Sequence, residues 1–293
     1  MSKVTIVSCY YPLSKSKHGI EEYFQWIHNF LTYVDTPIVM FGEGEMLSIM
    51  KDMRAKAGLA EKFLAVEKSF SSLRYSSPEW IGRWEHQVSK SNFPHLHNQE
   101  LFRIWANKSF FVEEAMRDNA FQSDIFVWCD AGCWRDPFTA QICGPSWPLP
   151  EKVVPNRLQI VAMNPIQPWL EKVAALPDYA PIESVVTQIN TRFVAIVGGT
   201  ILVGDKAAWQ TWIPTFEKAL EYYIDQDLFA GDDQAVITSA ALYLYKHNSP
   251  HRPLFLKAPP RSGFLSLQGR PFGDAWFCFQ QHFSRIDFTL ETY

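Results

Sequence analysis

The order of apolar patterns near the N-terminus restricts the folds open to this chain. Val4 to Cys9 is an apolar, largely β-branched run of the kind found in buried strands. Ile20 to Tyr33 carries apolar residues three and four positions apart, as an amphipathic helix does. Ile38 to Phe41 is a second short apolar run. A strand, a helix and a strand in this order predict a parallel sheet with a crossover helix, and hence an α/β fold.

The same alternation continues along the chain. Further helices are predicted at residues 45–57, 99–117, 206–223 and 235–245. Further strands are predicted at 62–66, 123–128, 158–163, 193–197, 201–203 and 254–256, whereas 69–97, 137–155 and 269–293 look irregular. The sequence has no internal repeat and no Gly/Ser-rich linker. We therefore expect one domain over residues 1–293.

Composition excludes several classes of protein. With 47% hydrophobic residues the chain can bury enough surface to fold, so disorder is excluded. A net charge of −4 without a basic tract argues against a nucleic-acid partner. No run approaches the length of a transmembrane segment, and the first apolar run is too short for a signal peptide. With five irregularly spaced cysteines, this predicts reduced thiols and a cytoplasmic location.

Asp130 is the first candidate for chemistry, because it follows an apolar strand directly. Ligands of open α/β sheets bind at the carboxyl ends of strands, where a carboxylate can hold Mg²⁺ or Mn²⁺ on phosphates. Ala131 and Gly132 would leave room for a bulky ligand. The same residues also suit an ordinary turn. Either His251 or His282 could complete a metal site, and the sequence does not choose between them.

Two further motifs allow a structural and a functional interpretation. Asp232, Asp233 and Gln234 open a predicted helix, where an acidic residue can act as an N-cap. One acid and the amide could instead bind sugar hydroxyls or act in catalysis. The pair Gly198 and Gly199 permits either a strand bulge or the close approach of a ligand to the backbone.

Basic and aromatic side chains supply the remaining candidates. Arg103 and Lys108 lie on the 99–117 helix. Lys108 either extends along the solvated face or neutralises a diphosphate at the end of the sheet. Most aromatic side chains belong in the core, but Trp80, Trp84 and Trp134 stand in polar or loop contexts. We expect these three to be exposed and able to stack on sugar rings.

Six segments occur in a fixed order between residues 4 and 242: VTIVSCYYPL, TPIVMFGE, HNQELFRIWANKSFFVEEA, SDIFVWCDAGCWRD, VGGTILVGDKAAWQTW and GDDQAVITSAAL. This ordered set resembles the HtrL/YibB (WlaTC-type) family of bacterial glycosyltransferases. The resemblance implies a GT-A-like fold, in which a Rossmann-type mixed sheet flanked by helices carries a nucleotide-sugar site at its carboxyl end.

The resemblance also implies an activity. The protein would move a hexose or related sugar from a UDP- or GDP-linked donor to a glycan acceptor, with retention and with Mn²⁺ or Mg²⁺. Related enzymes bind the metal through Asp-x-Asp, but Gly132 stands in the place of the second Asp. Asp130 is therefore either a single carboxylate ligand or a hydrogen-bonding group for ribose or sugar. Either a metal or Lys108 would stabilise the leaving diphosphate.

The resemblance assigns positions to the other candidates. Tyr11 would lie at the base-binding edge and Lys108 near the donor sugar or its phosphates. Gly198–Gly199 would line a sugar, and Asp233 with Gln234 would lie below the anomeric carbon. Two alternatives stay open: a non-catalytic nucleotide- or carbohydrate-binding module, and a metal-dependent phosphohydrolase, which would need more carboxylates at the strand ends.

Overall fold

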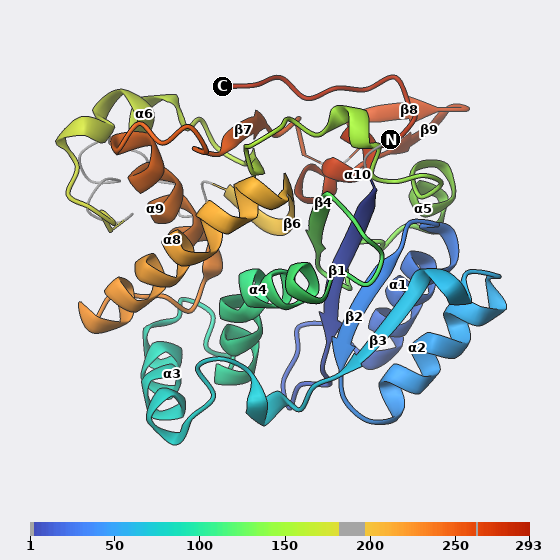
Figure 1. Cartoon of the computed structure of the whole chain (residues 1–293), viewed down its shortest axis with the longest axis horizontal. Helices are drawn as coiled ribbons and strands as arrows, with labels where there is room; N and C mark the ends of the chain where they lie inside the picture. Colours follow the sequence, from blue (N-terminus) through green and yellow to red (C-terminus); the bar gives the residue numbers. More distant parts are fainter. Residues whose placement is uncertain (1–2, 182–196, 262) are drawn as a thin grey trace.

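A seven-stranded sheet lies at the centre of the molecule (Figure 1). The structure is a computed structural model that describes residues 3–181, 197–261 and 263–293. The strands, in the spatial order β3-β2-β1-β4-β6-β5-β7, are Phe63–Glu67, Ile38–Gly42, Val4–Tyr10, Ile125–Cys129, Val197–Asp205, Gln159–Ala162 and Leu254–Lys257. A separate hairpin pairs β8 (Leu265–Leu267) with β9 (Arg270–Phe272).

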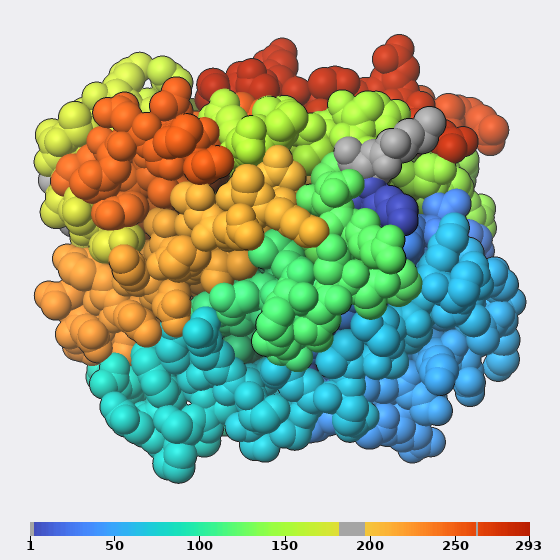
Figure 2. All heavy atoms as spheres, in the orientation of Figure 1, coloured from blue at the N-terminus to red at the C-terminus, as the bar shows by residue number. Residues whose placement is uncertain are grey.

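Helices flank this sheet. The helices are α1 Ile20–Tyr33, α2 Glu45–Lys56, α3 Pro78–Lys90, α4 Gln99–Asp118, α5 Pro137–Cys143, α6 Gln167–Lys172, α8 Lys206–Asp225, α9 Asp233–Lys246 and α10 Phe279–His282. In the space-filling view, the green middle of the chain lies between the blue and cyan N-terminal part and the orange region of α8 (Figure 2). None of the helices within the described residues is both long enough and apolar enough to cross a membrane.

The sheet is mixed, and this confirms the predicted α/β class. β1 pairs in parallel with β2 and β4, whereas β6 runs antiparallel to both of its neighbours, β4 and β5. Every residue of β1 and of β4 is buried, as expected for strands with helices on both faces. After β1 the chain forms β2 on one side of it, and β4 later pairs with the other side of β1. The switch point of the sheet therefore lies between β1 and β4.

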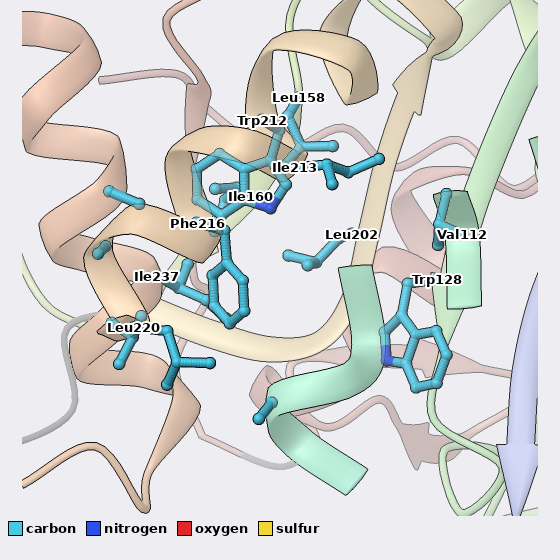
Figure 3. Close-up of a cluster of buried hydrophobic side chains, with 14 of the residues drawn as sticks. Val112, Trp128, Leu158, Ile160, Leu202, Trp212, Ile213, Phe216, Leu220 and Ile237 are labelled. Carbon is cyan, nitrogen blue, oxygen red and sulfur yellow. The ribbon is translucent and has the colours of Figure 1, made fainter. Parts of the chain in front are cut away.

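Each face of the sheet has its own apolar core. Alternate residues of β4 enter the two cores, because successive strand side chains point to opposite faces. On the α8 side, Trp212, Phe216 and Leu220 recur at helical spacing and pack with Leu202 of β6 and Ile237 of α9 (Figure 3). These contacts explain why the α8 pattern was readable from the sequence.

Segments expected to be irregular contain helices and strands. α3 lies within 69–97, and it begins at Pro78 with Ser77 as its cap. α5 begins at Pro137 inside the proline-rich segment, with Asp136 as its cap. Both starts follow from a capping side chain followed by proline at the first helical position. β9 and α10 lie in the C-terminal segment that looked like a loop.

The expectation that all three loop tryptophans are exposed is wrong for two of them. Trp84 and Trp134 are fully buried, and Trp80 is partly buried against the core. Trp84 Nε1 donates to the carbonyl of Tyr75 at 3.1 Å. Trp134 packs against the ring of Phe30. Contacts to distant segments, which local polarity does not reveal, decide their burial.

Candidate functional site

A cavity of about 640 Å³ opens at the switch point, where β1 and β4 end. Tyr10 and Tyr11 line it from the end of β1, and Asp130 lines it from the end of β4. The loop after β1, the start of α1, α4, β6 and the segment before α10 contribute its other walls. The cavity thus lies where open α/β sheets bind their ligands.

Asp130 is the carboxylate that β4 presents to this cavity. Its N–H donates to the carbonyl of Thr200 at 2.9 Å, which continues the β4–β6 pairing past the end of the strand. Trp128 Nε1 donates to Asp130 Oδ1 at 2.7 Å, and Lys108 Nζ lies 3.2 Å from the same oxygen. Burial raises the pKa of Asp130, while the charge of Lys108 opposes that shift.

Lys108 lies behind Asp130 as a buried cation. Its Nζ is 2.7 Å from Asp233 Oδ2, 2.9 Å from the carbonyl of Gly199 and 3.3 Å from Asp130 Oδ2. The ammonium donates to Asp130 and to the carbonyl of Gly199, and it forms an ion pair with Asp233. Burial alone would lower the pKa of Lys108, but the two carboxylates outweigh it and raise that pKa, which keeps the ammonium charged. Lys108 therefore reaches the sheet end without lining the cavity.

Gly199 makes room for the buried carboxylate rather than for a ligand. It lies inside β6, and a Cβ added there would stand 2.6 Å from Asp233 Oδ2 and 3.0 Å from Ile237 Cδ1. Of the strand predicted at 193–197, residues 193–196 lie outside the described residues, and Val197 is the first residue of β6. The pairing of β6 with β5 shifts register between Gly198 and Val203, which supports the strand-bulge interpretation, and the backbone of Gly199 approaches Asp233 of the same chain.

The three residues that open α9 have separate roles. Asp232 is the N-cap, and its Oδ1 accepts from the N–H of Gln234 at 3.0 Å. Asp233 is buried with Lys108. Gln234 lines the cavity, and its buried Oε1 has no hydrogen-bond partner among the described residues. Gln234 is thus the member of the motif available to a ligand.

Asp232 gives the protein a pH-dependent stability. Burial, followed by the charge of Asp233, raises the pKa of Asp232 to about 6. A raised carboxyl pKa stabilises the folded state at low pH, and this contribution is lost as pH rises through about 6. Asp232→Asn keeps a capping group without the charge. We expect its unfolding free energy, relative to the parent, to rise by up to about 3 kcal/mol between pH 4 and pH 7.

Chemical denaturation at several pH values measures this difference. Asp205→Asn, at the N-cap of α8, is the matched control for the loss of a capping carboxylate. A difference between Asp232→Asn and the parent that stays constant from pH 4 to pH 7 would contradict the prediction.

The cavity also contains the expected residues Tyr11, Ala131 and Gly132. The hydroxyl of Tyr11 donates to the carbonyl of Lys68 at 3.0 Å, which fixes the ring at the end of β1. A Cβ on Gly132 would lie 3.1 Å from Tyr23 Cε1, so only a residue without a side chain fits there without a shift of that ring. The rings of Tyr23 and Trp26 thus crowd the position at which the side chain of a second Asp would begin.

Arg103 and Gly198 do not line the cavity. Arg103 Nε donates to Ser76 Oγ at 3.2 Å, and its Nη2 donates to the carbonyl of Phe70 at 3.2 Å. A Cβ on Gly198 would lie 2.7 Å from Val161 Cγ1 in β5. Both residues make contacts within the chain and not the donor contacts considered for them, because each meets a segment distant in the chain.

The two histidines considered as metal ligands also lie elsewhere. His251 Nδ1 is 3.0 Å from the carbonyl of Asn156, and His282 Nδ1 accepts from the N–H of Leu290 at 3.1 Å. Neither lines the cavity. The histidine that does is His18, in the loop after β1, which the sequence did not single out.

Three basic side chains, Lys17, His18 and Arg135, line the cavity and are called the cationic rim below. Arg135 Nε donates to the carbonyl of Gly132 at 3.1 Å, and its guanidinium lies 4.3 Å from the centroid of Trp26. The His18 ring meets the same indole edge-on at 4.8 Å. None of the three residues was among the candidates drawn from the sequence. The signal was present in two basic residues close after the first strand and one after the Asp130 turn.

Trp276 is a further cavity residue that the sequence did not assign. Its side chain is 37% exposed, and Thr200 Oγ1 donates to its carbonyl at 2.9 Å. Asp274 Oδ1 accepts from the N–H of Trp276 at 2.8 Å. An indole held in this way beside a polar cavity suits the C–H face of a sugar or the face of a base.

The side chains present do not fit a divalent cation at Asp130. Mg²⁺ and Mn²⁺ sites are built from several oxygen ligands, among them carboxylates. Both oxygens of Asp130 face the Lys108 ammonium, and Trp128 donates to one of them. Gly132 supplies no second carboxylate. Within residues 3–181, 197–261 and 263–293, three or more His, Cys, Asp or Glu side chains nowhere form a group able to hold a metal.

No protein-family model matches the chain, and no curated protein matches it. Among solved structures, the chain is similar to core-mannan synthase A from Aspergillus fumigatus in its Mn/GDP form. The identity is 12%, the TM-score is 0.50, and the match covers 96% of this chain and 82% of that one. This similarity confirms a fold of the GT-A type. Mouse xyloside xylosyltransferase 1 in its apo form matches at 7% identity with a TM-score of 0.39, over 82% of each chain.

Proposed function

We propose that this protein transfers a hexose or related sugar from a nucleoside diphosphate donor, UDP- or GDP-linked, to a glycan acceptor. The observation that carries this proposal is the cavity at the switch point, which combines the carboxylate of Asp130 at the end of β4, a cationic rim and an exposed tryptophan. A fold shared with core-mannan synthase A, solved with Mn and GDP, supports a nucleotide ligand. Membership of the HtrL/YibB family and a single domain over 1–293 are part of the same proposal.

The chain's own residues suit the parts of such a donor. The base lies at Tyr11, where β1 ends. The diphosphate lies at the cationic rim. The sugar lies against Trp276 and accepts or donates hydrogen bonds at Gln234, whose side-chain oxygen lacks a protein partner among the described residues. Asp233 acts through Lys108 and not on the sugar, since it is buried away from the cavity.

The reaction is a substitution at the anomeric carbon. The bond from that carbon to the diphosphate oxygen breaks, and its electron pair leaves with the nucleoside diphosphate. The acceptor hydroxyl oxygen forms the new bond, and its proton passes to the departing diphosphate oxygen. We propose that the acceptor enters on the face that the diphosphate leaves, which retains the configuration. The oxygens of Asp130 and Gln234 stabilise the oxocarbenium-like sugar.

Hydrolysis and transfer from a panel of UDP- and GDP-sugars test this function. We expect the parent protein to release nucleoside diphosphate from at least one donor. Asp130→Asn keeps the acceptor for Trp128 Nε1 but removes the negative charge. Release should therefore fall at least about tenfold, at the lower end of what a lost electrostatic contact costs a transition state.

Two results would count against this function. Nucleotide binding without turnover of any donor would favour a non-catalytic binding module. The missing second Asp supports that alternative. Equal release by the parent and by Asp130→Asn would remove Asp130 from the reaction. The thermal unfolding of both proteins serves as the control for folding.

A further inference from the structure

The charges around the cavity suggest how the donor's diphosphate is neutralised. We propose that the charges of Lys17 and Arg135, with the imidazole of His18 beside them, neutralise it in place of a divalent cation, so that binding and transfer need no metal. This inference rests on the function proposed above. It departs from what the Asp-x-Asp comparison implied, because it gives the metal's electrostatic role to side chains of the chain itself.

The first observation is that the charge of Asp130, the carboxylate that a metal would need, is already balanced by Lys108. Lys108 is 5% exposed, and its ammonium donates to Asp130 and to the carbonyl of Gly199 and forms an ion pair with Asp233. The ammonium could not leave Asp130 without stranding the buried carboxylate of Asp233, which would be costly. A divalent cation on Asp130 would therefore stand next to a fixed positive charge.

The second observation is that a second carboxylate ligand, absent at Gly132, has little room at that position. Tyr23 and Trp26 pack over Gly132, with ring carbons 3.1 Å and 3.2 Å from the position of a Cβ. The other cavity carboxylate near the exposed tryptophan, Asp274, already accepts a backbone N–H at 2.8 Å as a helix cap. Asp130 therefore lacks a free carboxylate partner among the described residues that line the cavity.

The third observation is that two cations at the cavity, Lys17 and Arg135, have no carboxylate partner among the described residues. Arg135 uses only Nε in its contact with Gly132, and the rings of Trp26 and Phe277 hold the guanidinium from its faces. Its terminal N–H groups form the planar fork that suits phosphate oxygens. No carboxylate within the described residues forms an ion pair with Arg135 or Lys17.

His18 joins this cluster from the loop after β1. Burial, and next the charge of Arg135, lower the pKa of His18, and Lys17 adds to that effect. Glu22 Oε1, 3.6 Å from His18 Nδ1, is the carboxylate that opposes them. Like charges gathered beside a cavity repel each other until an anion enters. The loop after β1 and the turn after β4 thus bring two cations, Lys17 and Arg135, and the imidazole of His18 to the switch point.

The experiment measures the binding of UDP and GDP by calorimetry, and the transfer rate, in EDTA and again with Mn²⁺. We expect dissociation constants and rates to agree within about twofold in the two conditions. Arg135→Gln should weaken nucleoside diphosphate binding at least about tenfold, because it removes a charge-assisted phosphate contact. It should leave the weak binding of the free nucleosides unchanged. Lys17→Gln, in an exposed loop, should act in the same direction with little risk to folding.

Arg117→Gln is the matched control, since Arg117 is exposed at the end of α4 and pairs with Asp118. Its nucleotide binding should equal that of the parent. The inference is overturned, with the proposed function intact, if EDTA lowers binding or transfer more than about tenfold and Mn²⁺ restores it. Unchanged nucleotide affinity in both rim variants also overturns it. If neither nucleotide binds and no donor turns over in either condition, the proposed function fails as well.

Discussion

Lys108→Met is expected to lower the free energy of unfolding by about 3–5 kcal/mol, the range for breaking a buried ion pair by removing one partner. The side chain of Lys108 is 5% exposed and that of Asp233 6%. Methionine fills a similar volume but leaves two carboxylates facing each other without a cation. The carbonyl of Gly199 also loses its donor. This loss of unfolding free energy should become smaller as pH falls, because protonation of one carboxylate removes its repulsion of the other carboxylate.

Urea unfolding at pH 7 and pH 5 measures this loss. Lys68→Met is the matched control, because the pair of Lys68 with Glu114 is about one quarter exposed on each side. We expect it to cost at most about 1 kcal/mol, as partly exposed pairs do. Equal losses in the two variants would mean that the Lys108 pairs contribute no more than surface ion pairs.

Gly199→Ala is expected to lower sugar transfer by about 100-fold, the effect of a displacement near 1 Å among reacting groups. The added methyl would meet Asp233 Oδ2 at 2.6 Å and Ile237 Cδ1 at 3.0 Å. The carboxylate has to move, and Lys108 and Asp130 move with it. Overpacking of this kind also costs about 1–3 kcal/mol of stability.

Steady-state kinetics with the donor that the parent uses would measure the loss. Gly82→Ala is the control, since nothing lies within 4 Å of a Cβ at that position in α3. It should keep full activity and equal or exceed the parent in stability, because alanine favours a helix. Parent-like kinetics for Gly199→Ala would show that Asp233 can shift without disturbing Asp130.

Most strands of the central sheet and the helices that cover it were predicted from the sequence. The apolar runs of β1, β2 and β4 and the helical spacing of α1 and α4 were readable because burial on one or both faces leaves a local period. The position of Asp130 at the end of a buried strand followed from the same pattern. α3 was not readable, because its tryptophans pack against each other and against Tyr75, whose own ring is held by Phe110 of α4.

The cationic rim was harder to find than Asp130 for a different reason. Lys17 and His18 follow β1, whereas Arg135 follows β4, and the two segments are far apart in the chain. Parallel pairing of β1 with β4 puts their carboxyl ends side by side. A basic residue in a loop has no period that marks it as part of a site, so only the pairing of strands distinguishes it from an ordinary surface charge.

The sequence by itself determined the α/β class, the order of the main elements and the carboxylate at the end of β4. Only the tertiary structure decided that Lys108 points inward, that Asp232 is the cap while Asp233 is an ion-pair partner, and that Gln234 lines the cavity. The physical reason is that a strand or helix is specified by neighbours in the chain. The charge balance of a buried group depends on partners such as Asp130 and Asp233, which folding brings from separate elements.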